Sequence, residues 1–302
     1  MADRSHEPRA PLRTVGIIGL GIMGGAMARN LVAGGWRVIG YDIDPKAVAA
    51  AKQNGVDVAD APSAVAALAS DIITSLPSAQ AAIATAEAIA AEASASVVVM
   101  EMSTLSFEDK QRFAALLTEK GHIALDCPLS GTGAQAQSKD LVVYASGPRA
   151  EIERLQPLFL GLGRKCFDLG AYGNGTKMKF VANLLVAIHN VASAEAMVLG
   201  IKAGLCPQQI VEVIAAGAGT SRVFELRAPL MAEQRYQPAS MRCSVWQKDM
   251  HVIGDFATKL GCPTPLFSAT VPIYDAGLAS GFGAQDTASV CAVLEAMAGL
   301  SR

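Results

Sequence analysis

The fold of this chain is decided by Thr14-Val-Gly-Ile-Ile-Gly-Leu-Gly-Ile-Met-Gly24, an apolar run followed by three spaced glycines. The run predicts a buried parallel strand, and residues 22–32 have the periodicity of a helix. Gly19 allows the tight turn between them, Gly21 lets the backbone approach a pyrophosphate, and Gly24 permits close packing of helix on strand. The free N–H groups of the helix start favour phosphate. The residues expected to contact a dinucleotide here are Gly19, Leu20, Gly21, Ile22 and Met23.

An acidic residue, Asp42, follows the next predicted strand, about 20 positions after the glycines. A carboxylate at this position accepts hydrogen bonds from a ribose 2′-hydroxyl and repels a 2′-phosphate. We therefore expect NAD to be the cofactor, with NADP the poorer ligand. A turn or cap role for Asp42 remains an alternative, whereas Asp44, directly before Pro45, is expected to cap the following helix.

Composition excludes several classes of protein. The 302 residues include 25 basic and 27 acidic side chains, for a net charge of −2, which argues against a nucleic-acid or anionic-membrane partner. The longest apolar stretch, residues 180–199, is interrupted by polar residues, so we expect no membrane span. The six scattered cysteines form no Cys-x-x-Cys pair, which favours reduced thiols in a cytoplasmic protein and no metal site.

Two regions with different patterning follow one another. Residues 1–11 carry charges and prolines without an apolar core, so they are expected to be a disordered lead-in with no signal peptide. Apolar runs then alternate with helical patterns through residues 12–172, which predicts an α/β Rossmann-type domain with a doubly wound parallel sheet. Residues 173–302 lack strand signals and predict an all-α C-terminal domain for substrate binding and dimerisation, beginning with a long interdomain helix.

The expected elements have definite bounds. In the second region, helix breaks are expected at several Gly or Pro positions, including Ala228-Pro229. The helices expected between the strands include 78–92, 106–120 and 149–159. The expected strands are 15–18, 38–41, 71–75, 97–100, 123–126, 141–145 and 165–168.

The start of the second region carries an unusual pair of polar residues. Lys179 and Asn183 lie four positions apart in an otherwise apolar helical stretch, so they share one face. Burial lowers the pKa of a lysine towards values useful for proton transfer. The alternative is a lysine whose amine reaches solvent from a core helix, beside a capping asparagine.

Three loops that follow predicted strands carry small polar residues. Ligands of such sheets bind at the carboxyl ends of the strands, so these loops are expected to face the cofactor. Each of them alone is also explained by turn chemistry or helix capping. The residues in question are Leu76 and Pro77 after the third predicted strand, Thr104 after the fourth, and Ser130, Gly131 and Thr132 after the fifth.

Taken together and in this order, these segments resemble the β-hydroxyacid dehydrogenase family. The specific motifs are Gly-Leu-Gly-Ile-Met-Gly, Asp-x-Pro-x-Ser-Gly, Gly-x-x-Gly-x-Gly-x-x-x-Lys-x-x-Asn and the late pair Lys248-Asp249. The resemblance extends from about residue 13 to residue 298. The family includes 3-hydroxyisobutyrate and tartronate semialdehyde dehydrogenases, and its cofactor domain is like that of 6-phosphogluconate dehydrogenase.

The resemblance implies hydride transfer between NAD(H) and a small β-hydroxy acid or semialdehyde, by a homodimer or homotetramer. The resemblance implies that Lys179 is the general acid/base and that Asn183 positions the substrate. It implies that Ser130 and the N–H groups of Gly131 and Thr132 bind the substrate carboxylate. It also places Thr104 beside the nicotinamide and Lys248 in contact with substrate and cofactor.

The chain departs from the family pattern at Cys127, Leu129, Thr132 and Met241 and in the segment 136–141. Cys127 and Thr132 replace residues that are usually alanine and glycine, and Met241 replaces a common phenylalanine. These changes affect the expected substrate pocket, so the identity of the substrate stays open. An imine-reducing relative is one alternative, but such relatives usually lack the lysine. A non-catalytic nucleotide-binding protein on the same fold is another.

Overall fold

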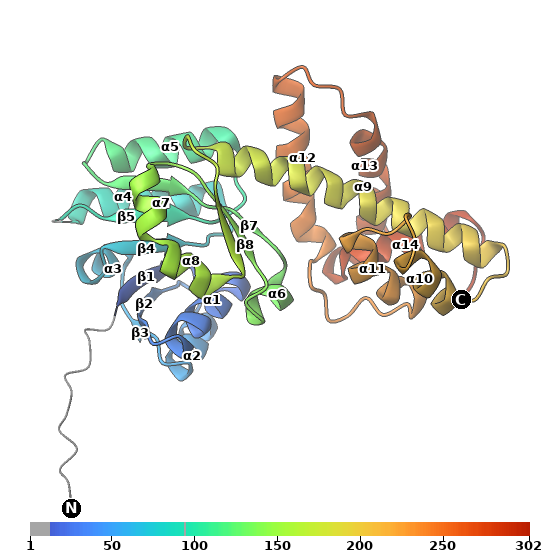
Figure 1. Cartoon of the computed structure of the whole chain (residues 1–302), viewed down its shortest axis with the longest axis horizontal. Helices are drawn as coiled ribbons and strands as arrows, with labels where there is room; N and C mark the ends of the chain where they lie inside the picture. The colour runs from blue at the N-terminus through green and yellow to red at the C-terminus, as the bar shows by residue number, and fades with distance from the viewer. Residues whose placement is uncertain (1–12, 94) are drawn as a thin grey trace, which may run out of the picture. The chain divides into compact units, whose positions relative to one another are not determined.

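The computed structural model describes residues 13–93 and 95–302, which divide into two compact units between Lys177 and Met178 (Figure 1). The expected disordered lead-in, residues 1–11, lies outside the described residues. The domain boundary expected at residues 172 and 173 comes just before helix α9 (Asn174–Lys202), which begins in the first unit and continues into the second.

The first unit is built on a six-stranded sheet in the order β3-β2-β1-β4-β5-β6, with every neighbouring pair parallel. The strand order reverses between β1 and β4, so the expected doubly wound Rossmann-type sheet is confirmed. Its strands are β1 (Thr14–Ile18), β2 (Arg37–Tyr41), β3 (Asp57–Val58), β4 (Asp71–Thr74), β5 (Val98–Glu101) and β6 (Ile123–Asp126).

The last two predicted strands exist but belong to a separate sheet. Strands β7 (Leu129–Ser130), β8 (Val142–Ala145) and β9 (Lys165–Asp168) form a three-stranded sheet, antiparallel between β7 and β8 and parallel between β8 and β9. Strands β3 and β7 were not predicted, because each has only two residues and shows no period in the sequence. A bridge between Asp126 and Ser146 connects the end of β6 to the residue after β8.

Helices cover both faces of the large sheet. Successive strand residues point to opposite faces, so Ile17 and Ile18 enter different cores. One face carries α3 (Pro62–Leu68), α4 (Ala79–Glu92) and α5 (Phe107–Thr118). The other carries α1 (Ile22–Ala33), α2 (Pro45–Gln53), α6 (Gly133–Gln137), α7 (Arg149–Arg154) and α8 (Gln156–Leu162).

One predicted helix is divided in two. The stretch expected as a single helix over 149–159 forms α7 and α8, which meet at Leu155. Pro157 lies in the first turn of α8, where its missing N–H is tolerated, but it cannot donate to a carbonyl of the preceding turn. The proline therefore separates the two helices.

The second unit is all helical, as expected. Its other helices are α10 (Pro207–Ala215), α11 (Arg222–Ala232), α12 (Cys243–Lys259), α13 (Pro265–Ala279) and α14 (Val290–Met297), with 3-10 turns η1 (Phe282–Ala284) and η2 (Thr287–Ser289). The break expected at Ala228-Pro229 is wrong, because Pro229 lies inside α11. Buried Phe224, Ala228 and Met231 hold both sides of the proline in one apolar contact surface, which outweighs the lost hydrogen bond.

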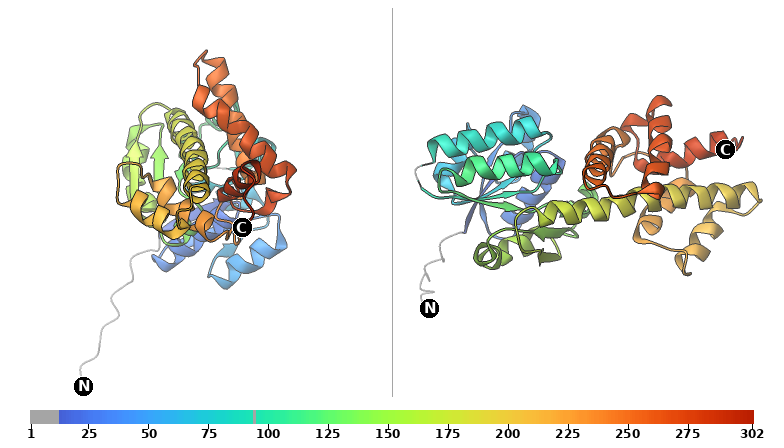
Figure 2. Two further views of the ribbon diagram at one scale, coloured as in Figure 1. Left: turned by 90° about the vertical axis from the view of Figure 1, so that its right-hand side faces the viewer. Right: turned by 90° about the horizontal axis from the view of Figure 1, so that it is seen from above.

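Helix α9 is the longest helix and runs along the other helices of the second unit (Figure 2). Its length and hydropathy of 1.7 match a membrane span, which the sequence was not expected to contain. However, 44% of the most apolar 18-residue stretch of this helix is buried inside the protein, and buried polar residues interrupt the helix. Asn190 donates to the Tyr274 hydroxyl on α13 and to the carbonyl of Thr287, each at 2.9 Å. These contacts are those of a helix packed against other segments of its unit.

Candidate active site

The glycine turn has the shape of a phosphate cradle. Gly19 has φ +92°, a left-handed conformation, and a Cβ there would collide with the carbonyl of Ser75. A Cβ at Gly24 would collide with the carbonyl of Gly19, so this glycine is required for packing of α1 against the turn. A Cβ at Gly21 would meet nothing within 4 Å, and Gly21 is exposed. The space above Gly21 and the N–H groups that open α1 therefore fit a pyrophosphate.

Asp42 is held against this turn. Its Oδ2 accepts a hydrogen bond of 2.6 Å from the N–H of Leu20, and its Oδ1 accepts one of 2.8 Å from the N–H of Asp44. The turn role is thus present, and each oxygen retains a lone pair for a ribose hydroxyl. Asp44 caps α2 through the N–H of Lys46, as expected. Arg37 is the arginine nearest to Asp42 in sequence. Its guanidinium is already engaged in an ion pair of 2.9 Å with Asp57.

The loops after β4 and β5 are tied together. The N–H of Leu76 donates to the Ser103 hydroxyl at 2.8 Å, and the N–H of Ser103 donates to Glu101 Oε1 at 2.9 Å. These two bonds bring Leu76 and Pro77 to the same edge of the sheet as Thr104. Ser103 belongs to the loop in which hydroxyls were expected, but its bond to Leu76, twenty-seven positions away, cannot be inferred from spacing along the chain.

The turn after β6 lies beside the glycine turn, since α6 packs against α1. Asn30 of α1 donates a buried bond of 2.7 Å to the carbonyl of Ala136, and a Cβ at Gly133 would meet Ile22 at 2.5 Å. Ser130 ends β7, and Gly131 adopts φ +134°, which only glycine accommodates without strain.

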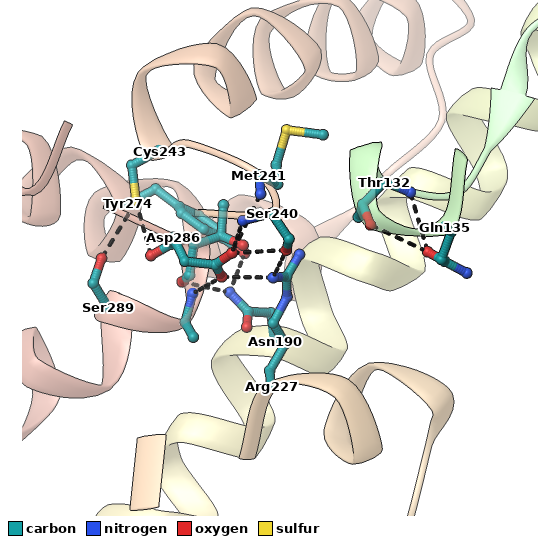
Figure 3. A network of polar contacts seen from close by, with 12 residues as sticks. Thr132, Gln135, Asn190, Arg227, Ser240, Met241, Cys243, Tyr274, Asp286 and Ser289 are labelled. Atoms are coloured by element: carbon teal, nitrogen blue, oxygen red, sulfur yellow. Dashed lines mark hydrogen bonds and ion pairs between the residues drawn. The ribbon is translucent and has the colours of Figure 1, made fainter. Parts of the chain in front are cut away.

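One expected anion donor is already engaged. The N–H of Thr132 donates to Gln135 Oε1 at 3.1 Å, and the Thr132 hydroxyl lies 3.5 Å from the same oxygen (Figure 3). This is a helix-capping arrangement at the start of α6. Ser130 and the N–H of Gly131 therefore remain the donors that we assign to a substrate carboxylate.

In the second unit, Lys179 and Asn183 lie buried together with an aspartate. Asn183 Nδ2 donates to Asp249 Oδ2 at 3.0 Å, and Lys248 Nζ lies 3.9 Å from Asp249 Oδ1. The exposed fractions are only 9% for Lys179, 6% for Asn183 and 7% for Asp249. Lys179 is thus largely buried, which favours the proton-transfer interpretation over that of an amine that reaches solvent.

Burial sets the protonation of this group. Desolvation lowers the pKa of Lys179 from its ordinary 10.5, while the charge of Asp249 opposes the shift and that of Lys248 adds to it. Desolvation likewise raises the pKa of Asp249, against the pull of Lys179 and Lys248. Lys179 is thus an amine that exchanges its proton more readily than a surface lysine.

Asp249, expected only as the second member of the Lys248-Asp249 motif, is the buried member of that pair. Lys248, which was expected to contact ligand, has a side chain that is 39% exposed. Asp249 lies on α12, seventy positions after Lys179. Only folding brings the two residues together, so their spacing gives no sign of it.

Met241 is fixed by its backbone. The carboxylate of buried Asp286 accepts hydrogen bonds from the N–H groups of Ser240 and Met241 at 2.8 and 3.2 Å, and from Arg227 at 2.5 Å (Figure 3). These contacts fix the turn that leads into α12. No group of three or more His, Cys, Asp or Glu residues suited to a metal occurs within residues 13–93 and 95–302.

Comparison with known proteins relates both units to dehydrogenases. Residues 14–170 match the model of the NAD binding domain of 6-phosphogluconate dehydrogenase. Residues 173–294 match that described as NAD-binding of NADP-dependent 3-hydroxyisobutyrate dehydrogenase.

Similar proteins and structures span nearly the whole chain. An L-threonate dehydrogenase of Haemophilus influenzae is 34% identical, covering 92% of this chain and 93% of its own. A 2-(hydroxymethyl)glutarate dehydrogenase of Eubacterium barkeri is 30% identical, covering 95% and 96%. The structure of Mycobacterium tuberculosis 3-hydroxyisobutyrate dehydrogenase with L-serine has a TM-score of 0.85 at 29% identity, covering 94% and 99%. A Streptomyces aurantiacus imine reductase, at 21% identity and TM-score 0.60, shares the fold alone.

We predict that NAD is preferred over NADP by about 10²-fold in kcat/KM, because Asp42 repels a 2′-phosphate. Steady-state rates with both cofactors and one substrate measure the ratio. Asp42→Asn should reduce the preference, whereas Glu92→Gln, an exposed carboxylate at the far end of α4, should leave it unchanged. Equal rates for NAD and NADP in the parent protein would contradict the prediction.

Proposed function

The chain belongs to the β-hydroxyacid dehydrogenase family, and we propose that Lys179 is the residue that moves the proton in its reaction. The protein is an NAD-dependent dehydrogenase that acts on CH–OH groups. The observation that carries the proposal is the burial of Lys179 beside the bonded pair Asn183 and Asp249. When bound, NAD supplies the hydride acceptor of the oxidation.

We assign cofactor binding to the first unit. The exposed backbone at Gly21 and the N–H groups at the start of α1, including those of Ile22 and Met23, would hold the pyrophosphate. Asp42 would accept from the adenosine ribose. Leu76, Pro77 and Thr104 would lie against the nicotinamide, as the carboxyl edge of the sheet predicts.

Proton transfer follows from the state of Lys179. As a neutral amine it accepts the proton of the substrate hydroxyl during oxidation, and as an ammonium it returns a proton during reduction of the carbonyl. Its lowered pKa makes both forms accessible nearer to neutral pH than for an exposed lysine. Asn183, held by Asp249, would orient the substrate oxygen.

The proposed substrate is a small hydroxy acid or its semialdehyde. Ser130 and the N–H of Gly131 would bind its carboxylate, and Lys248 would add positive charge. The names of the similar proteins support this class, since threonate and 2-(hydroxymethyl)glutarate both carry a carboxylate. Thr132 and Met241 would then determine which acid is accepted.

A panel of substrates tests the proposal. Absorbance of NADH would be followed with L-threonate, 3-hydroxyisobutyrate, 2-(hydroxymethyl)glutarate, simple semialdehydes, a cyclic imine and an alcohol without a carboxylate. We expect turnover with at least one hydroxy acid and none with the alcohol. Turnover of the imine alone would favour the imine-reducing alternative, and no binding of substrate would favour a non-catalytic protein.

Replacing Lys179 with alanine should lower kcat by about 10²-fold or more while the affinity for NADH stays nearly unchanged, because only the proton carrier is lost. The matched control is Lys177→Ala, an exposed lysine of the same helix, which should retain activity. In the parent, oxidation should accelerate as pH rises through the pKa of Lys179, which lies below 10.5, and reduction should slow over the same range. Rates of Lys179→Ala within a few-fold of the parent would refute the assignment.

We also propose a cytoplasmic homodimer or homotetramer. Support comes from exposed apolar residues along one stripe of α9, Met178, Val181 and Leu185, and from the absence of any disulfide among the six cysteines. Val181→Glu with Leu185→Glu should yield monomers in sedimentation velocity at micromolar protein. Val213→Glu, on exposed α10, serves as the control. A parent protein that sediments as a monomer would end this proposal.

A further inference from the structure

Three charged side chains are completely buried together in the first unit. Lys110 of α5 contacts the carboxylate of Glu101, which ends β5, and lies 3.0 Å from Asp126 Oδ1, which ends β6. It also donates to the carbonyl of Glu101 at 3.2 Å. The exposed fraction of all three side chains is zero. Burial would lower the pKa of Lys110, but the two carboxylates raise it above its ordinary value, so the lysine stays charged.

A buried ionic cluster is a poor source of stability, because the loss of hydration opposes the attraction between the charges. Its presence therefore requires another explanation. The cluster occupies the carboxyl ends of β5 and β6, the edge of the sheet at which ligands of this fold bind. The remaining hydrogen bonds of its two carboxylates indicate what it does.

Asp126 binds the first turn of α9. Its Oδ2 accepts from the N–H of Thr176 at 2.7 Å, and its Oδ1 accepts from the Thr176 hydroxyl at 2.7 Å. The hydroxyl of Ser146 accepts from the N–H of Gly175 at 2.9 Å and lies 3.3 Å from Asp126 Oδ2. An aspartate fifty residues upstream thus satisfies the unpaired N–H groups of the helix start, where negative charge is also favoured.

Glu101 binds the neighbouring loop. Its Oε1 accepts from the N–H of Ser103, whose hydroxyl accepts from the N–H of Leu76. In addition, Tyr172 donates its hydroxyl to the carbonyl of Lys110 at 2.9 Å, just before α9 begins. Lys110 therefore holds two carboxylates. Glu101 fixes the loops assigned to the nicotinamide, and Asp126 fixes the start of α9.

We propose that Lys110, Glu101 and Asp126 are positioning residues that hold the first turn of α9 and thereby the amine of Lys179. Lys179 follows Thr176 by three residues, within one turn of the same helix, so a shift of Thr176 moves the lysine directly. The inference rests on the proposed role of Lys179. None of the three residues touches the reacting atoms in this account.

The charges explain why the cluster contains a lysine. One ammonium and two carboxylates leave one negative charge, which the N–H groups of Thr176 and Ser103 face. Without Lys110, two adjacent buried carboxylates would face each other with no counter-ion between them, and their repulsion would disturb the contact of Asp126 with Thr176. Lys110 thus preserves the two-point contact between Asp126 and α9.

The test uses Thr176, because Thr176→Val removes one contact of Asp126 and leaves the charges in place. We expect kcat to fall about tenfold, as for other small displacements of a reacting group, with KM for substrate and affinity for NADH unchanged within twofold. Thr176→Ser, which restores the hydroxyl, should recover most of the loss. The proposal would be overturned if Thr176→Val kept the parental kcat, or if only its KM for substrate rose.

Lys110→Met extends the test to the cluster. Measured below its melting temperature, it should lower kcat more than Thr176→Val does. The matched control is Arg154→Met, which breaks the two-bond ion pair with Asp71, the first residue of β4. Asp71 lies at the amino ends of the strands, so this change should destabilise the fold without lowering kcat. Equal losses of kcat in both variants would mean that the cluster is only structural. If Lys110→Met does not fold, the Thr176 pair decides.

Lys179→Ala separates the two hypotheses. If Lys179→Ala retains the parental rate, the proposed acid/base role itself fails. If it loses activity while Thr176→Val and Lys110→Met retain theirs, the role of Lys179 stands and only the positioning inference falls.

Discussion

The first unit depends on one constraint, which is that parallel strands all end at the same edge of their sheet. The glycine turn after β1, Asp42 after β2 and the loops after β4, β5 and β6 meet there although they are distant in sequence. The N–H groups of Leu20 and Ser103 lie past the last bonds between strands, and the carboxylates of Asp42 and Glu101 bind them instead. The same edge therefore collects both the charges and the ligand-binding loops.

Much of this arrangement could be predicted from the sequence because its signals are local. The glycine spacing identified the tight turn between β1 and α1, the apolar runs identified most strands, and the four-residue separation of Lys179 and Asn183 placed both on one buried face. The family was recognisable for the same reason, since each of its motifs lies within a single turn or helix start. Such short-range patterns do not depend on how distant segments of the chain fold.

The missed features depend on contacts between distant residues. Asp249 meets Asn183 across sixty-six positions, and Asp126 meets Thr176 across fifty. Lys110 reads as an ordinary polar residue of an amphipathic helix, although it is fully buried against two carboxylates. The engagement of the Thr132 N–H by Gln135 is local, but it competes with anion binding, and spacing alone does not decide between the two uses of one donor.

The bond between Asn183 and Asp249 fixes which way the asparagine amide faces. An asparagine amide presents a donor on one side and an acceptor on the other, and turning it over here would bring Oδ1 against a carboxylate oxygen. The direction of Oδ1 is therefore a fixed property of the folded chain. In the proposed role of Asn183, the substrate hydroxyl would donate to this Oδ1, so Asp249 would set the direction of that hydrogen bond without touching the substrate.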